Sequence, residues 1–334
     1  MRLLFITQKI HENDDDLAFT VLWIEEFRKQ GFEIEVICLE KGEFSGSFPV
    51  HSLGKEEGVG LFGRMFRFLK LIVTLKYDRV FIHMNPEYFT IGGWWWALRG
   101  VPSYLWYTHY TMTIHLWFAG IFAKYLFAAT PQSLPQYEGN PKKVILGHGI
   151  DVKFWEVPST KEKINSYEMI SVHRLSRSKR LEIALKTLVL LPKEYTLVVY
   201  GRAVDPQYFK ELENLIEVLK ISSRVQFKGS VPMPELRQVY PHHRLMINMA
   251  SETIDKTMLE GMLFGLYPIT TPNNSQAIGL PVWPGNDTPE KVAEFILSQK
   301  WETYDKEILD SIVHEKHSLT KLVQSLSKYI KKEK

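Results

Sequence analysis

Short apolar runs alternate along the chain with segments in which apolar residues recur every three or four positions. The short runs are typical of strands buried on both faces, and the longer periodic segments indicate helices. The expected strands are Leu3–Ile6, Ile34–Leu39, Val80–His83, Tyr104–Tyr107, Tyr125–Ala129, Met169–Val172, Leu197–Tyr200, Val225–Phe227 and Leu245–Asn248. The expected helices are Leu17–Gln30, Phe62–Leu75, Glu182–Leu191, Pro206–Leu219 and Lys256–Phe264. This alternation predicts an α/β protein in which helices cover parallel sheets.

The pattern restarts near residue 167, after a polar stretch. Since 334 residues exceed one ordinary domain, we expect two Rossmann-like domains with a boundary at 152–166. The domains are assigned to residues 1–155 and 156–315. Residues 316–334 form a basic helix that could pack back on the first domain.

The charge, the cysteine count and the lengths of the apolar runs exclude several classes of protein. The net charge is +3 with basic residues spread along the chain, so no nucleic-acid partner is expected. Cys38 is the only cysteine, which excludes a disulfide within the chain and fits a reducing compartment. The N-terminal apolar run is too short for a signal peptide, and no stretch is long and apolar enough for a membrane span. We therefore expect a cytoplasmic protein, soluble or peripheral on the inner face of the plasma membrane.

Cationic side chains gather after the strand Met169–Val172, in His173-Arg174-Leu-Ser-Arg-Ser-Lys179-Arg180. Ligands of parallel sheets bind at the carboxyl ends of strands, and the N-terminus of a following helix attracts anions. Arg174 and Lys179 thus indicate a phosphate site, and the alternative is a solvated basic turn.

Two glutamates follow the strand Leu245–Asn248. Glu252 is expected in the loop and Glu260 in the next helix, and a carboxylate can accept both hydrogen bonds of a ribose diol. The helix start at Asp255 and Lys256 can hold phosphate or sugar oxygens through backbone N–H groups. The alternative is that Asp255 caps the helix and Glu260 lies on a wet face.

In order along the chain, these segments resemble the large retaining glycosyltransferase family numbered four, which has the GT-B fold. The segment from His173 is similar to the family's G-R-L-x-x-x-K-G, and Glu252 and Glu260 have the spacing of its E-x7-E motif. Further similar segments are Gly147–Asp151, Leu197–Gly201, Val225–Leu236 and Gly265–Thr270. The chain departs from the family at Thr253-Ile254, which replace Phe-Gly or Ser-Gly, and at His173 and Arg180, which replace glycines.

The resemblance implies a GT-B architecture whose two sheets face a central cleft, with the acceptor on the first domain and the donor on the second. It implies that Arg174 and Lys179 hold the diphosphate of a UDP- or GDP-sugar, that Glu260 binds its ribose, and that Glu252 binds its sugar hydroxyls. Gly201 would belong to the nucleotide-sugar site, together with Asp255 and Lys256. His109 matches the family's strand-end histidine at the donor sugar. The acceptor would be a glycan or a lipid-linked molecule.

The expected reaction is therefore a retaining sugar transfer. One alternative is a nucleotide-sugar epimerase of the same fold. The other is a non-catalytic nucleotide-sugar-binding protein, which is suggested by the altered residues Thr253-Ile254 after Glu252.

Two further sequence patterns concern metal binding and membrane contact. Asp14 and Asp16 have the D-x-D spacing of metal-dependent glycosyltransferases, but a helix-capping cluster explains them, and we expect neither a metal site nor a cofactor. The basic amphipathic segment Arg64–Lys76, with Trp94–Trp96 nearby, indicates contact with an anionic membrane. The alternative is a core-facing helix and buried tryptophans.

Overall fold

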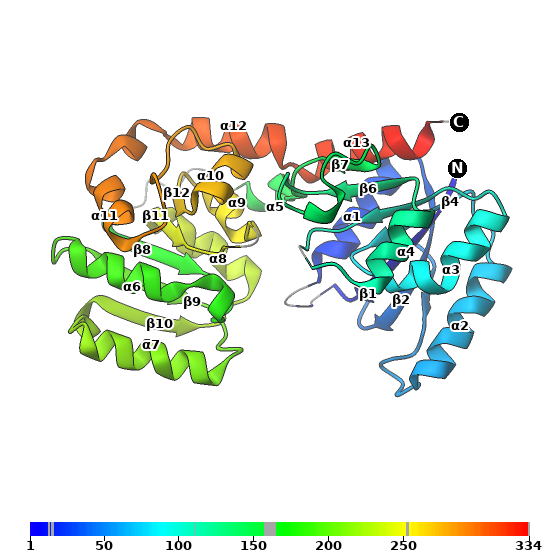
Figure 1. The fold of residues 1–334 in the computed structure, drawn as a ribbon, viewed down its shortest axis with the longest axis horizontal. Helices are drawn as coiled ribbons and strands as arrows, with labels where there is room; N and C mark the ends of the chain where they lie inside the picture. The colour runs from blue at the N-terminus through cyan, green and yellow to red at the C-terminus, as the bar shows by residue number, and fades with distance from the viewer. Residues whose placement is uncertain (13, 15–16, 110, 157–164, 252–253, 333–334) are drawn as a thin grey trace. The chain divides into compact units, whose positions relative to one another are not determined.

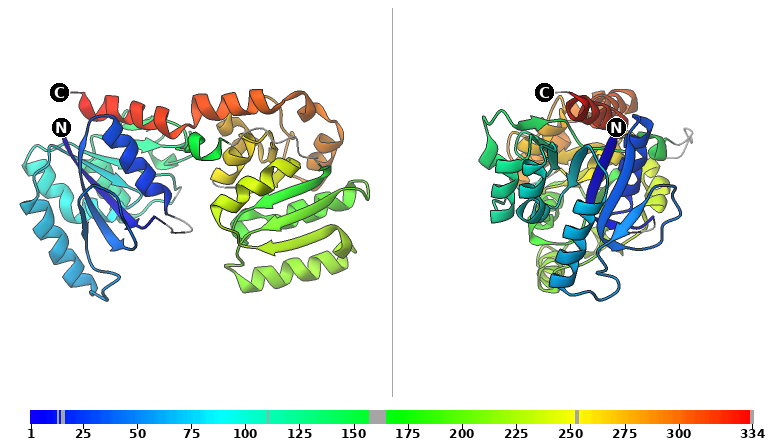
Figure 2. Two further views of the ribbon diagram at one scale, coloured as in Figure 1. Left: turned by 180° about the vertical axis from the view of Figure 1, so that it is seen from behind. Right: turned by 90° about the vertical axis from the view of Figure 1, so that its right-hand side faces the viewer.

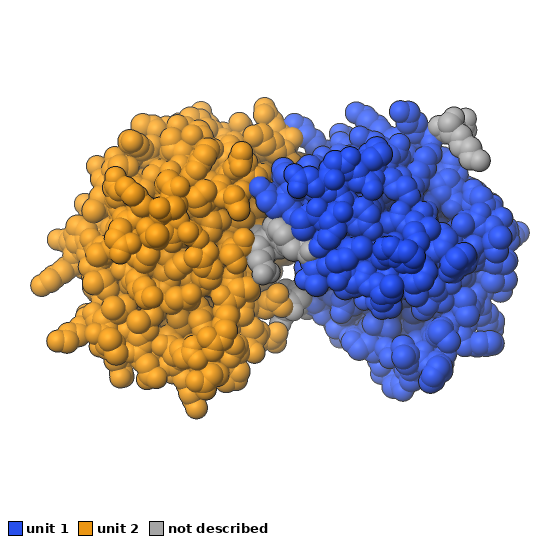
Figure 3. Space-filling model, in the orientation of Figure 1, with its two compact units in different colours: residues 1–149, 319–334 blue, residues 150–318 orange. Residues whose placement is uncertain are grey.

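The computed structural model describes residues 1–12, 14, 17–109, 111–156, 165–251 and 254–332 (Figure 1). The chain divides into two compact units, which Figure 3 colours separately. Unit 1 comprises residues 1–149 and 319–334, and unit 2 comprises residues 150–318. The division thus lies slightly before the predicted boundary.

Unit 1 contains a seven-stranded sheet in the order β3-β2-β1-β4-β5-β6-β7, with each neighbouring pair parallel. Its strands are β1 (Arg2–Ile10), β2 (Glu33–Lys41), β3 (Val50–Ser52), β4 (Arg79–His83), β5 (Ser103–Trp106), β6 (Tyr125–Ala128) and β7 (Lys143–Ile145). Along β1, Leu3 and Phe5 enter one core, and Leu4 and Ile6 enter the other. Burial on both faces explains why the central strands are continuous apolar runs.

Helices cover both faces of this sheet. On one face lie α1 (Phe19–Lys29) and α13 (Leu319–Lys331), whose apolar side chains share a core with Phe5. On the other lie α2 (Leu61–Thr74), α3 (Glu87–Leu98) and α4 (Ile114–Phe122), which share a core with Leu4. Figure 2 shows helix α13 beside α1, so the apolar side chains of α13 between Leu319 and Ile330 complete the core of unit 1.

Unit 2 contains a five-stranded parallel sheet in the order β10-β9-β8-β11-β12. Its strands are β8 (Asn165–Val172), β9 (Thr196–Tyr200), β10 (Val225–Gly229), β11 (His243–Asn248) and β12 (Tyr267–Thr270). Its helices are α5 (Val152–Trp155), α6 (Leu181–Leu190), α7 (Pro206–Val218), α8 (Met233–Val239), α9 (Lys256–Met262), α10 (Pro272–Ile278), α11 (Pro289–Leu297) and α12 (Lys306–Lys316). The prediction of parallel sheets covered by helices is confirmed. Among the described residues, no helix has the length and apolar character to cross a membrane.

Candidate functional site

The strand order of unit 2 changes direction between β8 and β11. From β8 the chain adds β9 and β10 on one side and then β11 and β12 on the other. Such a switch point is where open parallel sheets bind ligands, outside the carboxyl ends of the two strands. The segment from His173 follows β8, and the described residues Ser251 and Ile254–Lys256 come shortly after β11, so the described parts of both motifs follow these two strands.

The turn after β8 has an unusual backbone at its last residue. A short 3-10 helix (Arg177–Lys179) leads to Arg180, which adopts the left-handed conformation with φ 53° before α6 begins. Glycine adopts this conformation most readily, which explains why glycosyltransferase family four has glycine at the position of Arg180. The Arg180 guanidinium is anchored by Asp287, 2.5 Å away.

Most cations of this turn are neutralised within unit 2. Arg177 binds Glu211 through two nitrogens at 2.7 and 2.8 Å, and Lys179 pairs with Asp255. Arg174 is exposed, and in the described part of the chain it has no carboxylate partner. Its charge is therefore available to an anion from outside the chain.

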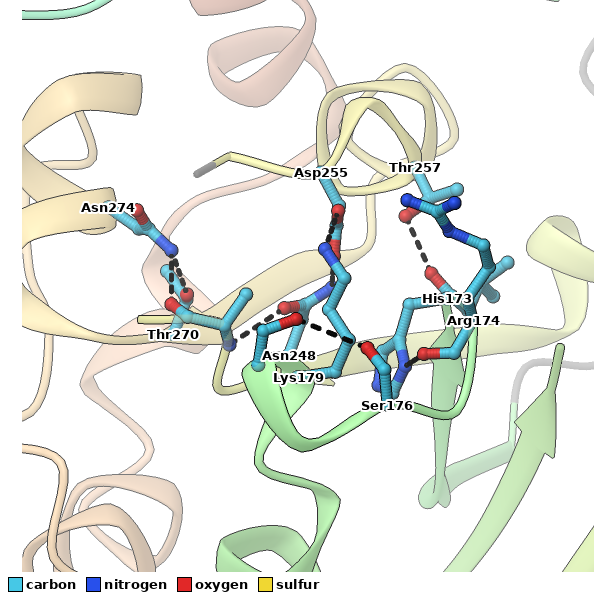
Figure 4. A network of polar contacts seen from close by, with 12 residues as sticks. His173, Arg174, Ser176, Lys179, Asn248, Asp255, Thr257, Thr270 and Asn274 are labelled. Carbon is cyan, nitrogen blue, oxygen red and sulfur yellow. Dashed lines mark hydrogen bonds and ion pairs between the residues drawn. The ribbon is translucent and has the colours of Figure 1, made fainter. Parts of the chain in front are cut away.

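Lys179 belongs to a buried polar network, drawn in Figure 4. Its amino group donates to Asp255, whose other carboxylate oxygen accepts from Asn248 Nδ2 at 2.7 Å. Asn248 Oδ1 in turn accepts from the Ala250 amide at 3.1 Å. The network joins the turn after β8 to the end of β11 and holds Lys179 at the switch point.

Asp255 precedes α9, but its side chain makes no capping hydrogen bond. Asp255 thus occupies the N-cap position of α9, as the alternative expected, but its carboxylate is directed to Lys179 and Asn248 instead of capping the helix. Thr257, in the first turn of α9, donates to the Val172 carbonyl at 2.7 Å and ties this helix to the end of β8.

Gly201 follows β9 and packs against the same turn. A Cβ atom at this position would lie 1.8 Å from the His173 carbonyl oxygen. Glycine is therefore required for the two backbones to approach each other. Gly201 shapes the segment that carries Arg174.

His173 is buried beneath this turn. Its Nδ1 donates to the Arg174 carbonyl at 3.0 Å, and its Nε2 lies 2.9 Å from Ser171 Oγ. Burial lowers the pKa of His173, so the ring is neutral near pH 7. It acts as a support for the backbone of Arg174 rather than as a cation at the site.

Glu260 lies on α9 with only 8% of its surface exposed. Burial raises the pKa of Glu260 to about 7, although neighbouring Lys256 opposes the shift. Burial likewise lowers the pKa of Lys256 to about 8, opposed by Glu260. The wet-face alternative for Glu260 is wrong. A carboxylate that titrates near neutral pH in a ligand-binding region is typical of a functional position.

Two predicted site residues are not part of this arrangement as described. Glu252 lies outside the described residues. His109 lies in unit 1 after β5, exposed, with its ring edge-on to Tyr107 at 5.3 Å. Its role toward a donor sugar stays a prediction.

The D-x-D pattern is described only at Asp14, because Asp16 lies outside the described residues. The Asp14 carboxylate accepts from the Leu17 amide at 2.8 Å and pairs with Lys9 at 2.9 Å. These contacts are those of a turn that precedes a helix. Within the described ranges, no group of three or more His, Cys, Asp or Glu is arranged to hold a metal ion.

Sequence reasoning missed the partners that hold the site. Asn248 is the last residue of β11, and a polar residue ending an apolar strand was an available signal for it. Asp287, by contrast, lies 107 positions after Arg180, and no local pattern links the two.

Two protein-family models match the chain, one in each unit. The model described as glycosyl transferases group 1 matches residues 155–277, and that described as glycosyl transferase 4-like matches residues 13–124. No curated protein matches the chain.

Solved structures match over almost the whole chain. HepE of Anabaena, in complex with UDP and glucose, is 16% identical with a TM-score of 0.76, covering 99% of each chain. Sucrose-phosphate synthase of Thermosynechococcus elongatus is 14% identical with a TM-score of 0.75, covering 99% of this chain and 98% of that one. The lipopolysaccharide outer core galactosyltransferase WaaB is 15% identical with a TM-score of 0.71, covering all of both chains.

The two parallel sheets and these structural matches define a protein of the GT-B fold. With a glycosyltransferase model matching in each unit, the chain is a glycosyltransferase.

Proposed function

We propose that the protein transfers a sugar from a nucleotide-diphosphate sugar to a glycan or lipid-linked acceptor, with retention of anomeric configuration. The observation that carries the proposal is Arg174, which is exposed at the switch point of unit 2 and has no carboxylate partner among the described residues. A cation at the carboxyl end of a central strand suits a diphosphate. The UDP and UDP-glucose bound to HepE support a uridine nucleotide as the first donor to test, with a guanosine nucleotide as the second.

In this proposal the residues of unit 2 act mainly through charge. Arg174 binds the diphosphate and stabilises the negative charge that grows on the leaving nucleotide, with Lys179 beside it, and this kind of stabilisation is often the largest catalytic contribution. Glu260 accepts hydrogen bonds from the ribose diol. Lys256 lies one turn before Glu260 on α9, and Asp255 fixes the position of Lys179.

The proposed reaction breaks the bond between the anomeric carbon and the donor phosphate oxygen. The acceptor oxygen bonds to the same face of that carbon, and its proton passes to the leaving phosphate. The chain's groups bind and orient the diphosphate, and we propose that neither a metal ion nor another cofactor takes part.

We further propose peripheral attachment to a membrane on its cytoplasmic side, which would suit a lipid-linked acceptor. The support is the basic, apolar character of α2 and the absence of any possible disulfide within a chain that has one cysteine.

The direct test incubates the purified protein with UDP- and GDP-sugars and follows release of the nucleoside diphosphate with and without acceptor glycans. We expect slow donor hydrolysis that an acceptor accelerates, and a product whose anomeric configuration by NMR equals that of the donor. An isomerised nucleotide sugar without acceptor would indicate an epimerase. Nucleotide binding without turnover of any donor would indicate a binding protein.

A further inference from the structure

One segment of unit 1 has a net positive charge because it contains few acidic residues. Residues 58–137 contain seven Lys or Arg and only two acidic residues, Asp78 and Glu87, a net charge of +5. The whole chain has +3, so the remainder is slightly acidic. This segment contains α2, α3 and α4, the layer on one face of the sheet (Figure 1).

Helix α2 buries only one edge of its apolar face. Phe68 and Ile72 enter the core, whereas Phe62 is 81% exposed and Phe66 is 71% exposed. Lys70 lies one helical turn beyond Phe66, so a cation borders the exposed aromatic surface.

Helix α4 is apolar on every side except at His115. Leu116 and Ala119 enter the core, and Ile114, Trp117 and Ile121 form an exposed stripe at spacings of three and four residues. A helix that is apolar all round is normally buried on all sides. Among the described residues, nothing covers the outer side of α4.

Helix α3 joins the other two. Trp95 donates its indole N–H to the Ile72 carbonyl of α2 at 3.1 Å, and the ring of Trp94 lies 4.8 Å from that of Phe122 on α4. Of the predicted cluster Trp94–Trp96, Trp96 is fully buried and Trp94 is the most exposed, at 58%. With Leu98, 84% exposed, it extends the apolar surface from α2 to α4.

We call this surface the α2–α4 face. It consists of the exposed residues Leu61, Phe62, Met65, Phe66, Leu69, Val73, Trp94, Leu98, Ile114, Trp117 and Ile121. In the described part of the chain, half of all exposed large apolar side chains belong to it. Contiguous apolar exposure on this scale marks an interaction site.

We propose that the α2–α4 face docks on the headgroup layer of an anionic lipid bilayer. Phenylalanine and tryptophan enter the boundary between headgroups and acyl chains, and Arg64 and Lys70 meet the anionic headgroups. Arg67 is paired with Glu57 at 2.7 Å, so its charge is already balanced. Acidic side chains, which would be repelled there, are missing from 58–77 and from 88–137. The helices are too short to cross the bilayer, so they lie on it.

The proposal rests on the peripheral attachment proposed above. It specifies which surface of the protein contacts the membrane and that the lipids it contacts are anionic. It extends the sequence-based prediction, which was confined to α2 and the tryptophans, to α4. A bilayer is favoured over a protein partner because both its headgroup charge and its apolar interior complement this face.

The test is flotation of the 334-residue chain with vesicles of phosphatidylcholine, with and without phosphatidylglycerol. We expect binding to the anionic vesicles that decreases as salt rises. Phe62→Ser with Phe66→Ser on α2, and separately Trp117→Ser on α4, should each weaken binding at least about tenfold. Lys70→Gln should weaken it about fivefold.

The matched controls lie on α7 of unit 2, where Val218 is 76% exposed and Lys210 is also exposed. Val218→Ser and Lys210→Gln should leave flotation unchanged. A thermal shift by UDP in each variant reports the donor site separately, so a failed donor proposal and a failed docking proposal give different results. No flotation at low salt, full binding by the Trp117→Ser variant, or a dimer by sedimentation that only the face variants dissociate would overturn the proposal.

Discussion

Arg174 and Arg177 lie three positions apart in the same turn, yet their surroundings give them different roles. Arg177 is held by Glu211, whereas Arg174 is exposed with no carboxylate partner in the described chain. The sequence predicted a cationic turn, but it did not predict which of its cations are paired with carboxylates and which is exposed. Which cation is neutralised depends on Glu211, Asp255 and Asp287, which folding brings from three other segments.

This difference gives a matched pair of substitutions. Arg174→Ala should lower the rate of sugar transfer at least about 100-fold, the usual effect of losing one preorganised charge-stabilising group. Arg177→Ala, which removes a charge from the same turn, should stay within a few-fold of wild type. Steady-state transfer rates of the two variants provide the measurement, and equal losses would contradict a specific role for Arg174.

The titration of Glu260 predicts a pH dependence of nucleotide binding. Burial raises the pKa of Glu260 to about 7, so the carboxylate is mainly protonated below that pH and mainly ionised above it. The ionised form accepts stronger hydrogen bonds. Affinity for UDP should therefore rise as pH increases through about 7, and the Glu260→Gln variant should lack this component. Calorimetry of both proteins across that range checks it, and parallel pH profiles would speak against it.

At the scale of elements, the strands were more predictable than the helices of unit 1. Strands β1 and β8 each contain an apolar run, Leu3–Ile6 and Met169–Val172, so their location follows from the pattern. The structure extends β1 to Ile10 and begins β8 at Asn165, and these polar parts have no such signal. Helices α3 and α4 are apolar on nearly every side, so they lack the periodicity that identifies a helix. The short strands β3 and β7 contain too few residues for any pattern.

The turn after β9 depends on a glycine. Gly201→Ala would place a Cβ 1.8 Å from the His173 carbonyl oxygen, which forces apart the two turns that form the edge of the site. We expect a loss of stability of about 1–3 kcal/mol, as for other overpacked positions, together with weaker nucleotide binding. Gly285→Ala, where nothing lies within 4 Å of the added atom, is the control. Thermal melts with and without UDP measure both effects, and a wild-type profile for Gly201→Ala would refute this role.

At the scale of the whole molecule, the chain builds two units of similar plan that carry different chemistry. Unit 2 holds the charged network at its switch point, and unit 1 carries the apolar α2–α4 face. The last helix returns to unit 1, so the two ends of the chain share one core. The two-domain architecture could be predicted from the restart of the strand–helix pattern, but the assignment of residues 319–334 to unit 1 required the structure.

The proposed chemistry uses arginine and lysine where a metal-dependent enzyme would use a divalent ion. Sugar transfer should therefore persist in excess chelator. The measurement is the initial transfer rate with EDTA, with added magnesium or manganese as the comparison. Loss of activity in chelator that either ion restores would contradict the proposal and direct attention back to Asp14 and Asp16.

The central claim is that the switch point of unit 2 binds the nucleotide part of a sugar donor, with Glu260 on the ribose. The most direct test is calorimetric titration of UDP and GDP into the wild-type protein and the Glu260→Gln variant at pH 8. Glutamine preserves the shape but removes the charge, so we predict a loss of about 1.5–3 kcal/mol, roughly 10- to 150-fold in affinity. The exposed Glu213→Gln on α7 should bind as wild type does. A folded Glu260→Gln protein that binds the nucleotide as tightly as wild type would contradict the claim.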